Sequence, residues 1–190
     1  MKTKPVLLLA LVGTLLALPS QAQVCVNFGP PPPLGTTYGA PVGQVSGDLA
    51  FSTNGIDAYV YNFALLPAGT AFYRAYITNA PVALPGQSLR PININMLFDL
   101  QNLAFVVRRV TFTYLDLGGY ENLAVNGSGI YRGQLAGAPA VLGNSNVSVT
   151  SVAIPPPFSG RTGTVTITGP QIKSFMIGGQ ELWIDNVCAQ

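Results

Sequence analysis

The sequence contains no histidine and only two cysteines. The lack of histidine excludes Ser–His–Asp and Cys–His catalysis and any zinc site built on imidazole. No glycine-rich phosphate loop follows a strand and opens a helix. A pair of carboxylates remains available for catalysis, but seven acidic residues will nearly always include some pair at a suitable distance. We therefore expect a non-catalytic protein, with glycoside hydrolase or esterase activity as a distant alternative.

Charged residues are also scarce, at 8% of the sequence. The formal net charge of +2 comes from Lys2 and Lys4, because residues 23–190 carry one lysine, six arginines and seven acidic residues, which balance. Arg108 and Arg109 are the only adjacent basic pair, and strand alternation would turn them to opposite faces. Nucleic acids and anionic membranes require a concentrated basic face, so we expect neither as a partner.

Long apolar runs are absent except near the N-terminus. Lys2 and Lys4 precede an apolar run over residues 6–18, and small residues follow at Ser20 and Ala22, a pattern typical of secretory signal peptides. The run is shorter than the roughly 18–20 residues needed to span a bilayer. We expect a signal peptide at 1–22, and a secreted (extracellular or periplasmic) single domain at 23–190 that is not inserted in the membrane.

The two cysteines, Cys25 and Cys188, lie close to the two ends of this domain. In an oxidising compartment an even pair favours a disulfide. The alternative is two buried free thiols. A bridge closing so long a loop would contribute roughly 5 kcal/mol by chain entropy. It would also require the first and last strands to lie side by side.

Short β-branched and aromatic runs, broken by glycine, proline and asparagine, occupy most of the sequence. Residues 109–115 are the clearest strand, because Val110, Phe112 and Tyr114 alternate with polar residues. Other expected strands cover 24–28, 48–52, 58–65, 71–78, 92–97, 123–125, 147–154, 163–168 and 181–188, with a short turn or helix at 98–103. This pattern predicts an all-β fold, a two-sheet antiparallel β-sandwich of jelly-roll type.

Residues 116–127 concentrate carboxylate and amide oxygens around Gly118 and Gly119. Hard cations such as Ca²⁺ bind such oxygens, so Asp116 and Glu121 are candidate ligands of a structural Ca²⁺. The alternative, which we favour, is a loop whose polar side chains bond to its own backbone.

The segment 175–188 contains the single tryptophan, Trp183. In an extended strand, Leu182, Ile184 and Cys188 share one face. Glu181, Trp183 and Asp185 would then share the other. An outward Trp183 could stack on a sugar while the flanking carboxylates accept hydroxyl hydrogen bonds. The alternative places the ring inside the protein, as is usual for large aromatic side chains.

A second aromatic stripe lies on one face of the expected strand at 58–65. It consists of Tyr59, Tyr61 and Phe63. Aromatic stripes on strands belong to the core more often than to a ligand platform, and we interpret this one as core.

The stretches 110–119, 122–127 and 177–187 resemble a group of uncharacterised secreted bacterial proteins with a galactose-binding-like, carbohydrate-binding-module-like jelly roll. The ending Ile184-Asp185-Asn186-Val187 is similar to the last strand of many carbohydrate-binding modules. The resemblance implies a jelly-roll sandwich. It assigns no binding residues, because this architecture carries lectins, cell-surface domains and inert spacers alike.

These observations predict a secreted, non-catalytic module that binds carbohydrate or a surface glycan through Trp183, Glu181 and Asp185. The alternative is a structural or adhesive extracellular surface component without a small-molecule ligand. Neutral net charge and low charge density favour self-association.

Overall fold

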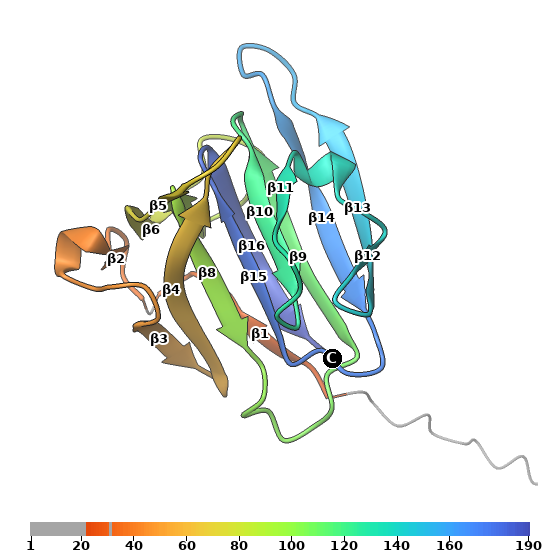
Figure 1. The fold of residues 1–190 in the computed structure, drawn as a ribbon. Helices are drawn as coiled ribbons and strands as arrows, with labels where there is room; N and C mark the ends of the chain where they lie inside the picture. The colour runs from red at the N-terminus through yellow and green to blue at the C-terminus, as the bar shows by residue number, and fades with distance from the viewer. Residues whose placement is uncertain (1–21, 31) are drawn as a thin grey trace, which may run out of the picture.

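The computed structural model describes residues 22–30 and 32–190, so the predicted signal peptide lies outside the described residues except for Ala22. The described chain is all-β, with two antiparallel sheets stacked face to face (Figure 1). The expected antiparallel β-sandwich is confirmed, whereas the jelly-roll topology stays a prediction. No helix among the described residues is long and apolar enough to span a membrane.

One sheet has nine strands, and its order places the last strand, β16, beside β1, β7 and β9. Along the sheet the strands are β12 (Val141–Leu142), β13 (Ser145–Ala153), β14 (Arg161–Thr168), β9 (Arg109–Asp116), β16 (Leu182–Ala189), β7 (Gln87–Ile92), β6 (Arg74–Asn79) and β2 (Thr37–Gly39). Off this path, β1 (Val24–Val26) pairs with β16.

The second sheet has seven strands. Its order is β11 (Tyr131–Gly133), β10 (Glu121–Val125), β15 (Ser174–Gly179), β8 (Ile94–Asp99), β4 (Ile56–Ala64) and β3 (Leu49–Thr53), with β5 (Thr70–Ala71) paired to the end of β4. Short 3₁₀ turns at Ala40–Val42 and Leu135–Gly137 complete the described elements. The expected turn or helix at 98–103 begins only after Asp99, because β8 continues through Asp99.

Alternating side chains of both sheets fill the space between them. Val110, Phe112 and Tyr114 of β9 are fully buried there, as the pattern over 109–115 predicts. Phe175 of β15 stacks on Phe98 of β8 with ring centroids 4.9 Å apart and on Phe112 of the opposite sheet at 5.5 Å. This aromatic stack therefore joins the two layers.

Replacing Phe175 with alanine should lower the free energy of unfolding by about 3–5 kcal/mol, because it removes a fully buried ring and leaves a cavity between the sheets. Urea or guanidinium unfolding measures the loss. Phe158→Ala is the matched control, since Phe158 lies between β13 and β14 with 39% of its surface exposed. Equal losses in the two variants would contradict this account of the core.

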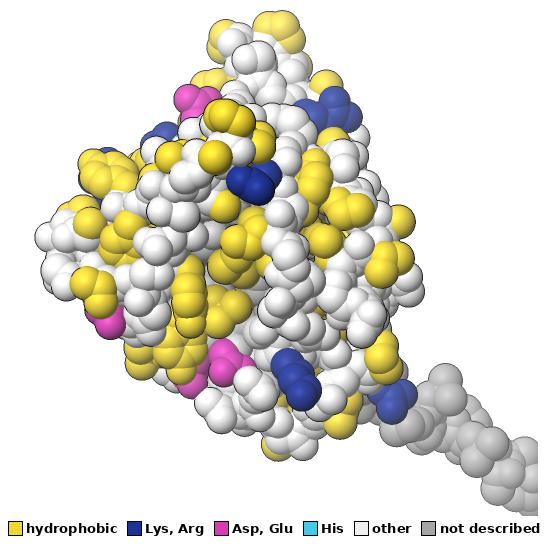
Figure 2. Space-filling model, viewed as in Figure 1, with side chains coloured by type: hydrophobic (Ala, Val, Ile, Leu, Met, Phe, Trp, Pro, Cys, Tyr) yellow, Lys and Arg dark blue, Asp and Glu magenta, His cyan; other side chains and the backbone are white. Residues whose placement is uncertain are grey.

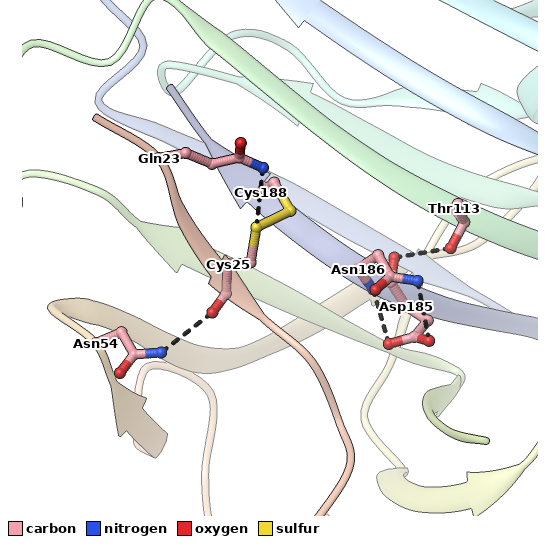
Figure 3. The surroundings of a disulfide bond; sticks show 7 residues. All are labelled: Gln23, Cys25, Asn54, Thr113, Asp185, Asn186 and Cys188. Carbon is pink, nitrogen blue, oxygen red and sulfur yellow. Dashed lines mark hydrogen bonds between the residues drawn. A yellow bond between two sulfur atoms is a disulfide. The ribbon is translucent and has the colours of Figure 1, made fainter. Parts of the chain in front are cut away.

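A disulfide between Cys25 and Cys188 joins β1 to β16, as expected from the two cysteines. The two residues are direct register partners in this antiparallel pair. Figure 3 shows the bridge with Asn54, whose side-chain amide donates to the Cys25 carbonyl oxygen. The prediction that the first and last strands lie side by side is confirmed.

The predicted faces of β16 are wrong beyond Asp185. The pairing of β16 with β9 shifts by one residue between Asp185 and Cys188, and Asn186 takes a positive φ of 52°. A β-bulge of this kind adds one residue to the strand, so each following side chain lies on the face opposite to the one that simple alternation predicts. Val187 and Ala189 therefore join Leu182 and Ile184 in the core. Cys188 instead leaves that face and meets Cys25.

Candidate functional site

Trp183 does not form the exposed platform that the outward-facing interpretation requires. Its ring lies on the outer face of β16, away from the sandwich core, but only 5% of its surface is exposed. A small apolar cluster with Leu84, Leu115 and Ile154 covers it. The guanidinium carbon of Arg90 also lies 4.2 Å from the ring centroid. The alternative, a buried tryptophan, is therefore correct, although the ring is buried outside the main core.

The two acidic residues that flank Trp183, Glu181 and Asp185, differ in burial. Glu181 is exposed, whereas Asp185 is buried. As Figure 3 shows, the Asp185 carboxylate accepts hydrogen bonds from the backbone N–H of Asn186 at 2.7 Å and from its side-chain amide at 3.2 Å. Burial raises the pKa of Asp185, and N–H donors from Asn186 and Phe28 oppose the rise. Asp185 thus stabilises the bulge, and the expected three-residue sugar site does not assemble.

The structure does bring Asp116 and Glu121 together. Asp116 ends β9 in one sheet, Glu121 begins β10 in the other, and both side chains face inward at the same end of the sandwich. The Asp116 carboxylate accepts from the N–H of Gly118 at 2.9 Å, and Glu121 Oε2 accepts from the N–H of Leu135 at 3.2 Å. Glu121 Oε1 is buried and accepts from no donor among the described residues.

This carboxyl pair holds a proton more tightly than isolated carboxyl groups do. Burial raises the pKa of Glu121 to about 8, the neighbouring Asp116 carboxylate adds to the rise, and the Leu135 N–H opposes it. Burial also raises the pKa of Asp116, against the hydrogen bond from Gly118. Burial and the nearby Asp116 carboxylate therefore favour the protonated form of Glu121 at this end of the sandwich.

The same pair was the candidate Ca²⁺ site. Among the described residues, no group of three or more His, Cys, Asp or Glu side chains could hold a metal ion. Two carboxylates supply at most four oxygens, and Ca²⁺ takes six to eight. Calcium at Asp116 and Glu121 stays a prediction, and protonation of Glu121 would allow the two carboxyl groups to be buried without it.

A second candidate site lies on the outer face of the seven-stranded sheet, where a depression of about 310 Å³ opens between β4 and the β10–β11 loop. Its floor and walls combine apolar side chains with amides and hydroxyls. The residues that line the depression are Ser46, Tyr61, Asn62, Leu97, Ala124, Asn126, Gly127, Ser128, Ile130, Ser174, Phe175 and Met176. Figure 2 shows hydrophobic side chains gathered on this face over β4 and β8. We call this depression the groove.

One wall of the groove exists because the end of β4 bends over the face of its own sheet. Asn122 of β10 accepts from the N–H of Ala64 at 2.7 Å and donates to its carbonyl at 3.1 Å, although β15 and β8 lie between their strands. Asn95 joins this network, donating to Asn122 at 3.2 Å. Gly178 separates Asn95 and Asn122 in the sheet. A Cβ there would collide with Asn95 and with the carbonyl of Ile94.

The opposite wall is a tight turn at Asn126-Gly127. Both residues take positive φ values, 51° and 70°, which suit a turn of this dipeptide. The Asn126 side chain accepts from the N–H groups of Lys173 and Ser174 at 2.7 and 3.3 Å. Both walls are therefore held by buried or cross-strand hydrogen bonds before any ligand arrives.

The aromatic stripe over 58–65 divides at this groove. Phe63 is fully buried and packs against Tyr120, with ring centroids 5.4 Å apart. Tyr59 is only half-buried, and 37% of Tyr61 is exposed at the groove. The interpretation of the whole stripe as core is therefore correct for Phe63 alone. The alternation in the sequence shows that the three rings share one face of β4. Which of these rings is buried depends on the bend at the end of β4, which the alternation does not show.

Comparison of the chain with family models, curated proteins and solved structures finds no match. The predicted resemblance to secreted galactose-binding-like proteins is therefore untested. What the site can do follows from its own geometry.

Proposed function

We propose that the protein is a non-catalytic carbohydrate-binding module whose groove on the seven-stranded sheet holds a glycan. The observation that carries the proposal is the exposed ring of Tyr61 at a preformed depression with an apolar floor and a polar rim. Concave, mostly apolar sites with a few placed polar groups are typical of small-ligand binding.

The floor suits the carbon–hydrogen face of a sugar ring. Leu97, Met176 and Ala124 occupy one row across β8, β15 and β10, and Tyr59 of β4 continues this row. Tyrosine offers a flat apolar face together with a hydroxyl that reaches water. A pyranose could lie on this row with Tyr61 beside it.

The rim offers partners for sugar hydroxyls. Asn62 is exposed at the edge of the groove, and its side-chain amide has no hydrogen-bond partner among the described residues. At the other end, Asp57 and Asp99 face each other across β4 and β8, and Asp99 is also the register partner of the groove residue Ser174. Like charges directly opposite each other destabilise a sheet. Protein donors already hold both carboxylates: Asp57 accepts from Ser52 and Asn102, and Asp99 accepts from Gln101, so this pair fixes the adjoining loops at that end of the groove.

The geometry argues against catalysis at the buried pair of carboxyl groups. Asp116 and Glu121 are almost completely buried between the sheets, where a polysaccharide has no access. Glycosidases instead place their carboxyl groups on both sides of an accessible glycosidic bond.

Replacing Tyr61 with alanine should weaken glycan binding about tenfold or more, because the stacking surface at the groove is lost. A glycan array with residues 23–190 identifies the ligand, and calorimetry then compares the variants. Phe158→Ala is the control, since it removes a similarly exposed ring at 39% exposure from the loop after β13 and should bind normally.

If Tyr61→Ala bound the glycan with unchanged affinity, the groove would not be the binding site. If no glycan binds at all and sedimentation shows concentration-dependent association, the protein is instead the structural or adhesive surface component that low charge density favours.

A further inference from the structure

On the nine-stranded sheet, away from the groove, two arginines alternate with aromatic rings. Arg90 of β7 lies between Trp183 and Tyr76, with its guanidinium carbon 4.2 and 5.8 Å from the ring centroids. Arg74 of β6 lies between Tyr76 and Tyr73, at 4.8 and 5.2 Å. We call these five side chains the arginine ladder.

The hydrogen-bonding capacity of the ladder is mostly unused. Arg90 donates from Nη1 to the Tyr76 hydroxyl at 2.8 Å. The Nε atoms of both Arg74 and Arg90 are buried and have no partner among the described residues. Each guanidinium carries five N–H donors, and buried donors without acceptors are rare in native proteins unless an ion or water satisfies them.

The two positive charges also lack a counter-charge. Arg90 is the register partner of Tyr76, which makes Arg74 and Arg90 diagonal neighbours, with Cβ atoms about 7–8 Å apart. No described carboxylate forms an ion pair with either guanidinium. Glu181 lies against Gly118 instead, since its Oε2 is 3.1 Å from the position that a Cβ on that glycine would take. Stacking on rings offsets desolvation of the guanidinium groups but does not remove their mutual repulsion.

We propose that the arginine ladder binds the carboxylate or sulfate groups of an acidic polysaccharide. The planar guanidinium matches such oxyanions with two parallel hydrogen bonds from its terminal Nη groups. An anion near both arginines would accept from the Nη donors and reduce the repulsion between the two charges. The proposal goes beyond the groove and does not depend on it.

A polymer fits this site better than a free ion. Half-exposed guanidinium groups bind a single anion only weakly in water, whereas a chain that repeats its charge gains affinity by rebinding. Single-stranded nucleic acid fits less well, because it needs free aromatic faces for base stacking. Trp183 is covered, and arginines already occupy the Tyr76 ring.

The test measures binding of the disulfide-bonded protein to heparin, polygalacturonate, neutral dextran and single-stranded DNA, at low and high salt. We expect binding to at least one of the two acidic polysaccharides, weakened by salt, with little binding to dextran or DNA. The double variant Arg74→Gln/Arg90→Gln should lose about tenfold or more of this affinity. The control Arg108→Gln/Arg109→Gln removes the same charge from two exposed residues and should keep it.

Arg90 packs on Trp183, so its replacement alone can disturb folding. Arg74→Gln provides the second measurement, since it should lower affinity several-fold with an unchanged melting temperature. Unchanged affinity in Arg74→Gln, equal losses in the two double variants, equal binding of DNA, or no binding of either acidic polysaccharide would each overturn the proposal. Loss of glycan binding in Tyr61→Ala tests the groove separately and leaves this result unaffected.

Discussion

Raising the pH from about 5 to about 9 should destabilise the protein, and Glu121→Gln should remove most of this dependence. The pKa of Glu121 is raised in the folded protein to about 8, from a model-compound value of 4.5. Between these two values the folded state keeps a proton that the unfolded state has released. The resulting stability is fully present below about pH 4.5 and is lost as the pH rises through about 8.

The expected size of this effect is large for one side chain. Each unit of pKa difference corresponds to about 1.4 kcal/mol, so the whole window is worth on the order of 3–5 kcal/mol, or roughly 10 °C in Tm. Asp116 titrates with Glu121, and the loss therefore belongs to the pair. Glutamine at position 121 stays neutral at every pH and can still donate to Asp116.

Thermal unfolding across the pH range measures this effect. Glu121→Gln should match the unchanged protein near pH 5 and be the more stable of the two near pH 9. Glu181→Gln is the control, because it removes an exposed carboxylate close to Asp116 and should keep the original slope. A flat profile for the unchanged protein, or the same slope in Glu121→Gln, would show that the pair carries no buried proton.

Removing the disulfide should have the second large effect. The double variant Cys25→Ala/Cys188→Ala opens a bridge between residues 163 positions apart, which should cost about 2–5 kcal/mol and lower Tm by roughly 5–15 °C. Among the described strands, β1 pairs with β16 alone. Its hydrogen bonds should therefore be the first to open.

Hydrogen exchange locates this loss. Protection at Val24–Val26 should fall furthest in the variant, while the strand pair β13–β14, which lies at the far side of the sheet, should change little. Reductant should reproduce the change in the unchanged protein and have no effect on the double variant. If reductant lowered the stability of both proteins equally, the lost stability would not come from the Cys25–Cys188 disulfide.

The sequence was most informative where one local signal dominates. The alternation over 109–115 predicted β9, and the two terminal cysteines predicted the pairing of β1 with β16. Strand β15 was missed because Gly178 and Gly179 resemble a turn. In the structure, Gly178 is required in the strand so that Asn95 and Asn122 can meet.

The site was less predictable, because it depends on contacts between distant residues. Trp183 is covered by Leu84 and Ile154, which are far from it in the sequence. Tyr61 is exposed at the groove only because the end of β4 bends over its sheet to Asn122. No local pattern signals either event. The two arginines of the ladder likewise meet only through the register of β6 and β7.

The chain provides its own probe of the central claim, that a glycan occupies the groove. Of its three methionines, Met96 is fully buried in the core, Met176 is half-buried at the groove and Met1 lies in the predicted signal peptide. Methyl NMR of the protein labelled at methionine, titrated with a glycan selected on the array, should shift the Met176 signal and leave Met96 in place. A bound glycan that leaves both signals unmoved would contradict the account.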